Sequence, residues 1–319
     1  MELSSLGAGR SVVVYGSLAY DRVMYFLGRF RDHLLPQKLH VLSVSFAVPT
    51  VRESFGGTAG NIAYNLSLLG EQPHLYGSAG NDFTNYHKWL TKQGIATTQL
   101  TITKKLATAA AYIMTDRDDN QISAFSVGAM AKRCILPAAS GLRHSLVIIA
   151  PGNPQDMVAL ARRCVIAEAQ YLWDPGQQIL QFSRADLAQC VNQAAVLIGN
   201  DYEISLIARK LGFTELSLLK KAPLAVRTLA ARGSEIWIQG IRIKIPPVRT
   251  RVVDPTGAGD AYRAGFIVGL RQGWPLATVG RFASLVASYT VQEYGTQTHH
   301  FTWADLRRRY RNAFGQTLP

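Results

Sequence analysis

Residues 251 to 270, RVVDPTGAGDAYRAGFIVGL, combine residue types that can handle a phosphate group. Gly257 and Gly259 permit a tight turn and let the backbone approach a ligand without a Cβ in the way. The segment after them is expected to form a helix, whose first N–H groups and dipole attract an anion. Asp260 would repel a bound phosphate unless it had a chemical task, such as accepting the proton of an attacking hydroxyl. The stretch therefore indicates phosphoryl transfer to an alcohol.

A simpler explanation of the same stretch is a strand-to-helix turn in which Asp260 is only a first-turn acid favoured by the helix dipole. By residue types alone the two explanations stay open. A P-loop is excluded, because the chain has no G-x-x-x-x-G-K-[ST] motif and no glycine that precedes a lysine.

The elements that must position this turn follow a regular order from about residue 140. Short apolar runs alternate with helical patterns, which predicts a mostly parallel sheet covered by helices on both faces. In such sheets ligands bind beyond the carboxyl ends of the strands. The turn at 254–260 is expected there, after a strand that ends in RVV, and the small residues of the next helix are expected to pack closely on the sheet. The alternating segments are 145–151, 154–168, 169–175, 183–193, 194–200 and 203–211.

The N-terminal third has a different pattern. Residues 11–17 predict a buried strand, and 18–55 are expected to form exposed strands without a helical period. Two strand-like runs flank the turn DRDDN at 116–120, and Ile62, Leu66 and Leu69 predict a helix that ends at Gly70. We therefore expect one doubly wound α/β domain over 1–319, with a small sheet formed from about 18–55 and 107–127.

The bulk composition indicates an ordinary globular protein. The chain has 319 residues, 48% of them hydrophobic and 17% charged. Its three cysteines, Cys134, Cys164 and Cys190, are odd in number and lack C-x-x-C spacing, so we expect neither a disulfide framework nor structural zinc. The N-terminal MELSSLGAGR is unlike a secretory signal, and no apolar run is long enough for a membrane span. These features predict a cytoplasmic protein with no membrane partner.

The net charge of +13 raises the question of an acidic partner. Part of the excess lies near the C-terminus, where Arg307, Arg308, Arg309 and Arg311 lie on a segment expected to be helical. A solvated helix face explains these arginines without a ligand, and no nucleic-acid-binding motif accompanies them. We therefore expect no nucleic-acid partner despite the charge.

Two motifs resemble the signatures of the ribokinase (PfkB) family of carbohydrate and nucleoside kinases. DPTGAGDAYRAGF, residues 254–266, is similar to the specific C-terminal signature, and FGGTAGNIAYNLSLLG, residues 55–70, is similar to the less specific N-terminal one. The resemblance covers nearly the whole chain in order. It implies a ribokinase-like fold with a β-sheet lid over the substrate, and an ATP-dependent kinase that requires Mg²⁺ and in some members a monovalent cation.

The resemblance assigns roles on the side of the reacting groups. Asp260 matches the catalytic base, and the backbone of Gly257, Ala258 and Gly259 matches the anion hole around the transferred phosphoryl group. Asp21 matches the aspartate that binds sugar hydroxyls. The substrate-side glycine pair and its asparagine correspond to Gly56, Gly57 and Asn61. Without the resemblance, Asp21 and the glycines could equally be turn residues.

The nucleotide side carries a weaker match. Asn200 and Glu203 in NDYE match the family's N-x-x-E motif, in which Glu203 would organise Mg²⁺ through water, although the same pair could be only a helix capping box. Thr228 and Gly233 match a nucleotide loop in which Ala230 replaces the usual glycine, and residues 293–301 are expected near the adenine. We also include Asp254 among the cofactor-binding residues.

The acceptor is predicted from the lid segment. Residues 30–66 look closest to bacterial adenosine kinases, and Tyr25, Phe26, Phe30 and Phe46 could stack on a purine or form the core of the lid. We expect adenosine, converted to AMP in purine salvage. The alternatives are a sugar kinase of the ribokinase or fructokinase type, and a non-catalytic protein that binds nucleotide or nucleic acid. The chain is expected to be a monomer or a dimer formed through its lid.

Overall fold

The computed structural model describes residues 11–34, 36–41, 43–118 and 120–319, and the side chains of residues 36, 38 and 39 are left out. The MELSSLGAGR segment and one residue of the 116–120 turn lie outside the described residues. In the described ranges, no helix is long and apolar enough to cross a membrane.

The central layer is an eight-stranded sheet with the order β14-β13-β12-β11-β10-β9-β1-β4. The neighbouring strands β11-β12, β10-β11, β9-β10, β1-β9 and β1-β4 pair in parallel. The pairs β12-β13 and β13-β14 are antiparallel. The predicted mostly parallel sheet is therefore confirmed. Its strands are β1 (Ser11–Tyr15), β4 (His74–Tyr76), β9 (Ser145–Ile149), β10 (Gln170–Trp173), β11 (Val196–Asn200), β12 (Leu224–Thr228), β13 (Ser234–Ile238) and β14 (Ile241–Ile245).

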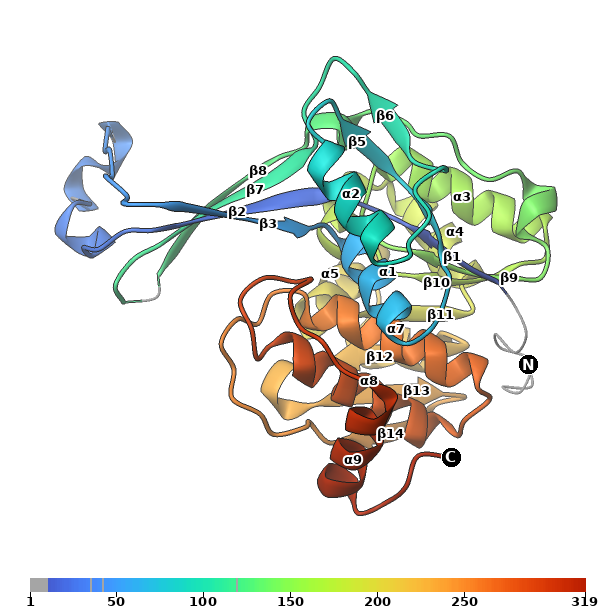
Figure 1. Cartoon of the computed structure of the whole chain (residues 1–319). Helices are drawn as coiled ribbons and strands as arrows, with labels where there is room; N and C mark the ends of the chain where they lie inside the picture. Colours follow the sequence, from blue (N-terminus) through green and yellow to red (C-terminus); the bar gives the residue numbers. More distant parts are fainter. Residues whose placement is uncertain (1–10, 35, 42, 119) are drawn as a thin grey trace.

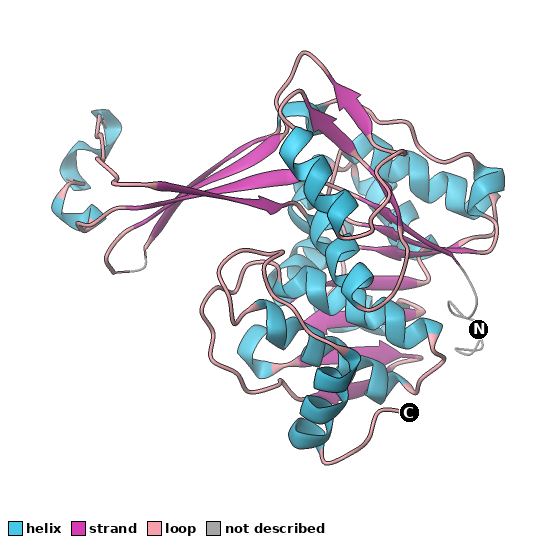
Figure 2. Cartoon of the chain, in the orientation of Figure 1, coloured by secondary structure: helices cyan, strands magenta, loops and turns pink. Residues whose placement is uncertain are grey.

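Helices cover both faces of this sheet (Figures 1 and 2). The alternation of side chains along a strand separates the core into two layers. In β1, Val12 and Val14 join the cluster that includes α1, α7, α8 and α9, whereas Val13 and Tyr15 join the cluster of α3, α4, α5 and α6. The helices are α1 (Thr58–Leu68), α2 (Thr84–Lys92), α3 (Pro154–Ile166), α4 (Arg184–Gln193), α5 (Asp201–Leu211), α6 (Glu215–Lys221), α7 (Ala258–Arg271), α8 (Leu276–Thr290) and α9 (Trp303–Phe314).

A separate four-stranded sheet projects from the body (Figure 1). Its order is β3-β2-β7-β8, and the hairpin expected around 116–120 is the β7–β8 pair. The expectation of strands throughout 18–55 is wrong in its middle, where 3-10 helices at Phe30–Asp32 and Pro36–Val41 lie between β2 and β3. The four strands are β2 (Ala19–Tyr25), β3 (Val51–Gly56), β7 (Ala109–Thr115) and β8 (Gln121–Ser126), and a short pair is β5 (Ser78–Gly80) with β6 (Thr101–Thr103).

Two further local expectations need correction. The RVV segment before the glycine turn is not a strand, although Val253 N donates to Val291 O at 2.7 Å. The small residues of α7 pack on a helix rather than only on the sheet. A Cβ on Gly265 would lie 2.9 Å from Ala283 Cα, and one on Gly269 would lie 3.1 Å from Val279 Cα, both in α8.

Candidate active site

Helix α7 begins at the glycine turn, where Ala258 N donates to Pro255 O at 3.3 Å. Gly257 is the N-cap residue with φ 77° and ψ −4°, a left-handed conformation that favours glycine. A Cβ on Gly257 would also lie 2.9 Å from Thr296 Cβ. Within the described ranges no side chain caps this helix, so its N-terminus can receive an anionic group.

Asp260 lies in the first turn of α7 and is partly buried. Asn61 Nδ2 donates a hydrogen bond to Asp260 Oδ2 at 2.8 Å. Burial raises the pKa of Asp260 to about 7, the charges of Asp174 and Asp21 add to the rise, and Arg263 and the Asn61 hydrogen bond oppose it. A carboxyl group with this pKa can take up a proton near neutral pH and release it again, as a general base requires.

Asn61 is more deeply buried than a residue that only lines a substrate pocket. Its side chain is 4% exposed, and its Oδ1 lies 2.7 Å from Thr296 Oγ1 and accepts from Gln297 Nε2 at 3.0 Å. The structure therefore brings Asn61 to Asp260 and to the loop after α8. Its predicted contact with substrate remains a prediction.

Asp21 and the Gly56–Gly57 pair come together where β2 and β3 join the body. A Cβ on Gly56 would lie only 2.3 Å from Asp21 Oδ2, and Gly57 has φ 86° with backbone atoms of Ser17 and Ala19 within 2.6 Å of a hypothetical Cβ. Burial, and then the charge of Asp254, raises the pKa of Asp21 to about 6. Only glycine fits at position 57, whereas a Cβ at position 56 would displace the Asp21 carboxylate.

Asp254 is a third carboxylate of the site, and its charge acts on Asp21. Its Oδ1 accepts from Thr256 N at 2.9 Å and its Oδ2 accepts from Gly295 N at 3.1 Å. Asp21, Asp254 and Asp260, which come from distant parts of the sequence, thus influence one another electrostatically.

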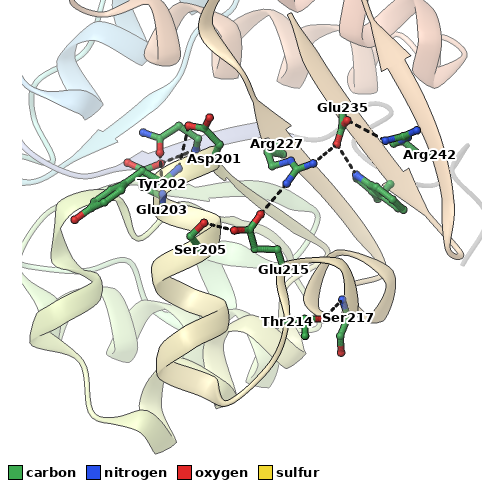
Figure 3. Close-up of polar contacts among 12 residues, drawn as sticks. Asp201, Tyr202, Glu203, Ser205, Thr214, Glu215, Ser217, Arg227, Glu235 and Arg242 are labelled. Carbon is green, nitrogen blue, oxygen red and sulfur yellow. Dashed lines mark hydrogen bonds and ion pairs between the residues drawn. The ribbon is translucent and has the colours of Figure 1, made fainter. Parts of the chain in front are cut away.

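Asn200 and Glu203 form the capping box of α5, as the simpler explanation of the NDYE motif proposed. Figure 3 shows Glu203 at the start of this helix. Asn200 Oδ1 accepts from Glu203 N, and Asn200 N donates to Glu203 Oε2, each at 2.8 Å. Glu203 also faces the core of the site, because its Oε2 lies 4.0 Å from Arg263 Nη2. Burial, and then the charge of Asp174, raises the pKa of Glu203.

Arg263 of α7 lies between the glycine turn and the NDYE motif. It was not identified from the sequence. It is 6% exposed, and its Nε forms an ion pair of 2.5 Å with Oδ2 of Asp174, a residue 1% exposed. A Cβ on Gly259 would lie 2.8 Å from Arg263 Nη1, so the guanidinium lies directly beside the glycine turn. An arginine between the apolar residues of this helix was the signal that could have identified it.

A direct metal site is not apparent in the described part of the chain, where no cluster of three or more His, Cys, Asp or Glu side chains could hold an ion. One oxygen of Glu203 is already engaged by Asn200 N and lies near Arg263. These contacts fit a Mg²⁺ carried by nucleotide phosphates and reached through water better than one bound in a protein cage.

Thr228 lies on the strand next to β11, and Gly233 lies in the turn that follows it. Thr228 ends β12 and is in register with Asn200 at the end of β11. Gly233 has φ 88°, and a Cβ there would lie 2.1 Å from Ile245 O. Thr228 is therefore beside the capping box, while Gly233 shapes the turn into β13.

A polar hollow of about 560 Å³ lies beside these strand ends, between α5 and the β12–β13 turn. Its charged groups pair with one another, since Arg227 bridges Glu215 and Glu235 (Figure 3) and Arg232 pairs with Asp201. It is lined by none of the predicted site residues, and it supports no functional role of its own.

For the aromatic residues of the projecting sheet, the sequence leaves both purine stacking and a role in its core open. Phe26, Phe30 and Phe46 pack on one another with ring centroids 4.9 to 6.0 Å apart. They belong to the segment between β2 and β3, which lies at the outer end of the projecting sheet (Figure 1). Tyr25 is 45% exposed. The mutual packing of the three phenylalanines supports the core explanation for them.

The C-terminal arginines are largely engaged within the protein. Arg308 pairs with Asp305, Arg309 lies 4.4 Å above the Tyr289 ring, and Arg307 lies 5.9 Å above the Trp303 ring. These contacts favour the solvated helix face over a nucleic-acid patch.

The model of the pfkB family carbohydrate kinases matches residues 10–303. A nucleoside kinase of Methanothermobacter thermautotrophicus is 33% identical over 315 residues, which cover 97% of this chain and 98% of that protein.

Solved structures agree with this relationship. The Burkholderia thailandensis nucleoside kinase in complex with inosine is 35% identical, with a TM-score of 0.86 and coverage of 96% of this chain and 99% of that one. The same enzyme with ADP-inosine gives 36% identity, a TM-score of 0.84, and coverage of 96% and 97%. The fold, the two signature motifs and these similarities agree: the chain belongs to the pfkB family of carbohydrate kinases and is a phosphotransferase with an alcohol acceptor.

Proposed function

We propose that this chain transfers the γ-phosphate of ATP to the 5′-hydroxyl of a purine nucleoside, with adenosine, converted to AMP, as the first candidate acceptor. The observation that carries the proposal is Asp260, a partly buried carboxyl with a pKa of about 7 in the first turn of α7. A proton acceptor beside the N-terminus of a helix suits attack by a hydroxyl on a phosphoryl group.

In the proposed reaction the acceptor oxygen forms a bond to the γ-phosphorus while the bond from that phosphorus to the β–γ bridging oxygen breaks and ADP leaves. Asp260 accepts the hydroxyl proton. The amides of Gly257, Ala258 and Gly259 stabilise the negative charge on the transferred group. Arg263, buried beside Gly259, reduces the repulsion among the carboxylates.

The nucleotide is assigned to the ends of β11 and β12, where Asn200 and Thr228 are in register. Glu203 is the residue that we propose to hold Mg²⁺ through water, and the bound ion would neutralise phosphate charge. Gly233 and Asp254 would shape the two sides of this region, from the β12–β13 turn and from the loop before α7.

The acceptor is assigned to Asp21 and the Gly56–Gly57 pair. A carboxylate suits the two vicinal hydroxyls of a ribose, since it is an acceptor with two oxygens. The projecting sheet would act as a lid that excludes water from the transferring phosphate. A nucleoside acceptor is supported by the related nucleoside kinases, one of them described with inosine.

The acceptor is tested with a panel of adenosine, inosine, guanosine, cytidine, ribose and fructose, with ATP as donor. We expect 5′-monophosphates of purine nucleosides as products, identified by mass spectrometry, and a lower kcat/KM for both sugars. Turnover of ribose or fructose alone would replace this proposal by a sugar kinase.

The base is tested by Asp260→Asn. This variant keeps the helix amides but cannot accept a proton, so kcat should fall by about a thousandfold or more. Calorimetric affinity for a non-hydrolysable ATP analogue should change by less than about threefold. Near-normal kcat would show that Asp260 is not the base.

A further inference from the structure

A directed chain of hydrogen bonds runs through the protein to Asp260. Trp89 Nε1 in α2 donates to Gln297 Oε1 at 3.0 Å, and Gln297 Nε2 donates to Asn61 Oδ1 at 3.0 Å. Asn61 Nδ2 in α1 then donates to Asp260 Oδ2 at 2.8 Å. Gln297 lies in the loop between α8 and α9 and is 3% exposed. Four segments distant in sequence thus contribute to one chain.

The polarity of this chain is set at one end. An indole N–H can only donate, so Trp89 fixes Oε1 of Gln297 toward itself and turns Nε2 toward Asn61. Asn61 must then present Oδ1 to Gln297 and Nδ2 to Asp260. A carboxylate can only accept, so the far end has the matching polarity. An amide has two orientations of nearly equal shape, and here its partners select one.

The other hydrogen bonds of Gln297 and Asn61 are consistent with these amide orientations. Gln297 Nε2 also lies 2.5 Å from Tyr86 OH, and Tyr86 donates its own proton to Gly56 O at 2.8 Å. Tyr86 therefore accepts from Gln297. Thr296 Oγ1 has a single proton for two acceptors, Phe55 O at 2.9 Å and Asn61 Oδ1 at 2.7 Å, so it cannot replace Gln297 as a constant donor.

We propose that Gln297 is a positioning residue for the catalytic base, acting through Asn61 by holding the Asn61 amide with its N–H group toward Asp260. This inference rests on the proposed role of Asp260. Gln297 does not touch the transferred group in the proposed reaction. Its effect is to keep a donor, rather than a second acceptor, beside the carboxylate.

The charged surroundings of Asp260 make this donor important. From other elements it faces Asp174 after β10, Asp21 in β2 and Tyr86 in α2, and on its own helix it faces Arg263. The two other carboxylates and burial favour the protonated acid, whereas Arg263 and Asn61 favour the ionised base. If Asn61 turned its oxygen toward Asp260, the hydrogen bond that favours the ionised carboxylate would be lost, and only Arg263 would still lower the pKa.

The test is the pH profile of kcat in Gln297→Met, which keeps a similar volume but has no amide. The rate depends on ionised Asp260, so kcat declines as the pH falls through its pKa. We expect this acid limb to move up by about one pH unit, and kcat at pH 6 to fall by about tenfold. The KM for ATP should change by less than about threefold. Trp89→Phe removes only the N–H that sets the polarity, and it should shift the limb in the same direction by a smaller amount.

Tyr171→Phe is the matched control. Tyr171 OH is a buried donor to Cys190 O at 2.6 Å in the opposite core layer, so its loss should lower stability without moving the acid limb. An unchanged acid limb in folded Gln297→Met and Trp89→Phe would overturn the inference, and Trp89→Phe decides alone if Gln297→Met does not fold. Failure of the proposed function is separate, because it would appear as an active Asp260→Asn.

Discussion

Ala230 has a backbone conformation that alanine rarely adopts. Its φ is 50°, in the left-handed region, within the 3-10 helix Ala230–Arg232 between β12 and β13. The resemblance to the family predicts a glycine at this position. The structure keeps the conformation that suits glycine, although the residue is alanine, so the turn is retained at the cost of local strain.

Replacing Ala230 with Gly should therefore stabilise the protein. The gain is expected to be about 0.5 to 1 kcal/mol, because relief of left-handed strain exceeds the extra backbone entropy of glycine in the unfolded chain. Urea unfolding measures this change. Gly141→Ala is the control, because it makes the reverse replacement at a glycine whose φ is not positive and whose Cβ would meet nothing within 4 Å. A loss of stability in Ala230→Gly would contradict the strain argument.

At the scale of elements, helix α7 contributes both the proposed base and the cation that offsets it. Arg263 follows Asp260 by three residues, so both lie on one face of the helix. The partner carboxylates come from other elements, Asp174 after β10 and Glu203 in the first turn of α5. The buried guanidinium of this helix therefore lies beside the glycine turn and near the capping box of α5.

Replacing Arg263 with Met would leave Asp174 buried without its cation. Removal of one partner of a buried ion pair costs about 3 to 5 kcal/mol, so the variant should be strongly destabilised in urea. The double variant Arg263→Met with Asp174→Asn removes the unpaired charge and should recover part of this loss. Equal stability of the two variants would contradict a dominant role of the buried charge.

At the scale of the whole molecule, acidic groups gather where the projecting sheet joins the body. Asp21 comes from the projecting sheet, and Asp254 and Asp260 come from the body. The pKa values of Asp21 and Asp260 are raised to about 6 and about 7. Ionising these groups in the folded protein costs free energy that the unfolded chain does not lose, so the site is assembled against local repulsion.

This repulsion predicts how stability depends on pH. An Asp with a raised pKa binds its proton more tightly in the folded state, so its contribution to stability declines as the pH rises from about 4 to about 7. Asp260→Asn removes this contribution and should gain on the order of 2 kcal/mol relative to the native chain at pH 8, with a much smaller gain at pH 4.5. Urea unfolding at both values measures the difference. An equal change in stability at pH 8 and pH 4.5 would show that ionisation of Asp260 does not destabilise the folded protein.

Local sequence patterns were sufficient for the main elements. Hydrophobic runs and periodicity located the parallel strands and most helices, because burial on both sheet faces imposes those patterns. The glycines at 57 and 257 were identified by motif, and their positive φ values give the physical reason for them. The β7–β8 hairpin followed from its turn residues, whereas the 3-10 helices at 30–41 did not, since short polar segments without a period have no distinctive pattern.

By itself, then, the sequence determined the fold class, the glycine turn and the aspartate beside it, because these depend on local residue types and spacing. Only the tertiary structure decided what surrounds Asp260. Asn61 and Asp174 approach it from separate segments, and Gln297 contacts Asn61 from a third. Arg263 lies on the same helix as Asp260, but its ion pair is with Asp174. No local pattern encodes which distant side chains meet. The charge state of the proposed base depends on these meetings, since burial and neighbouring groups, rather than the residue type, set its pKa.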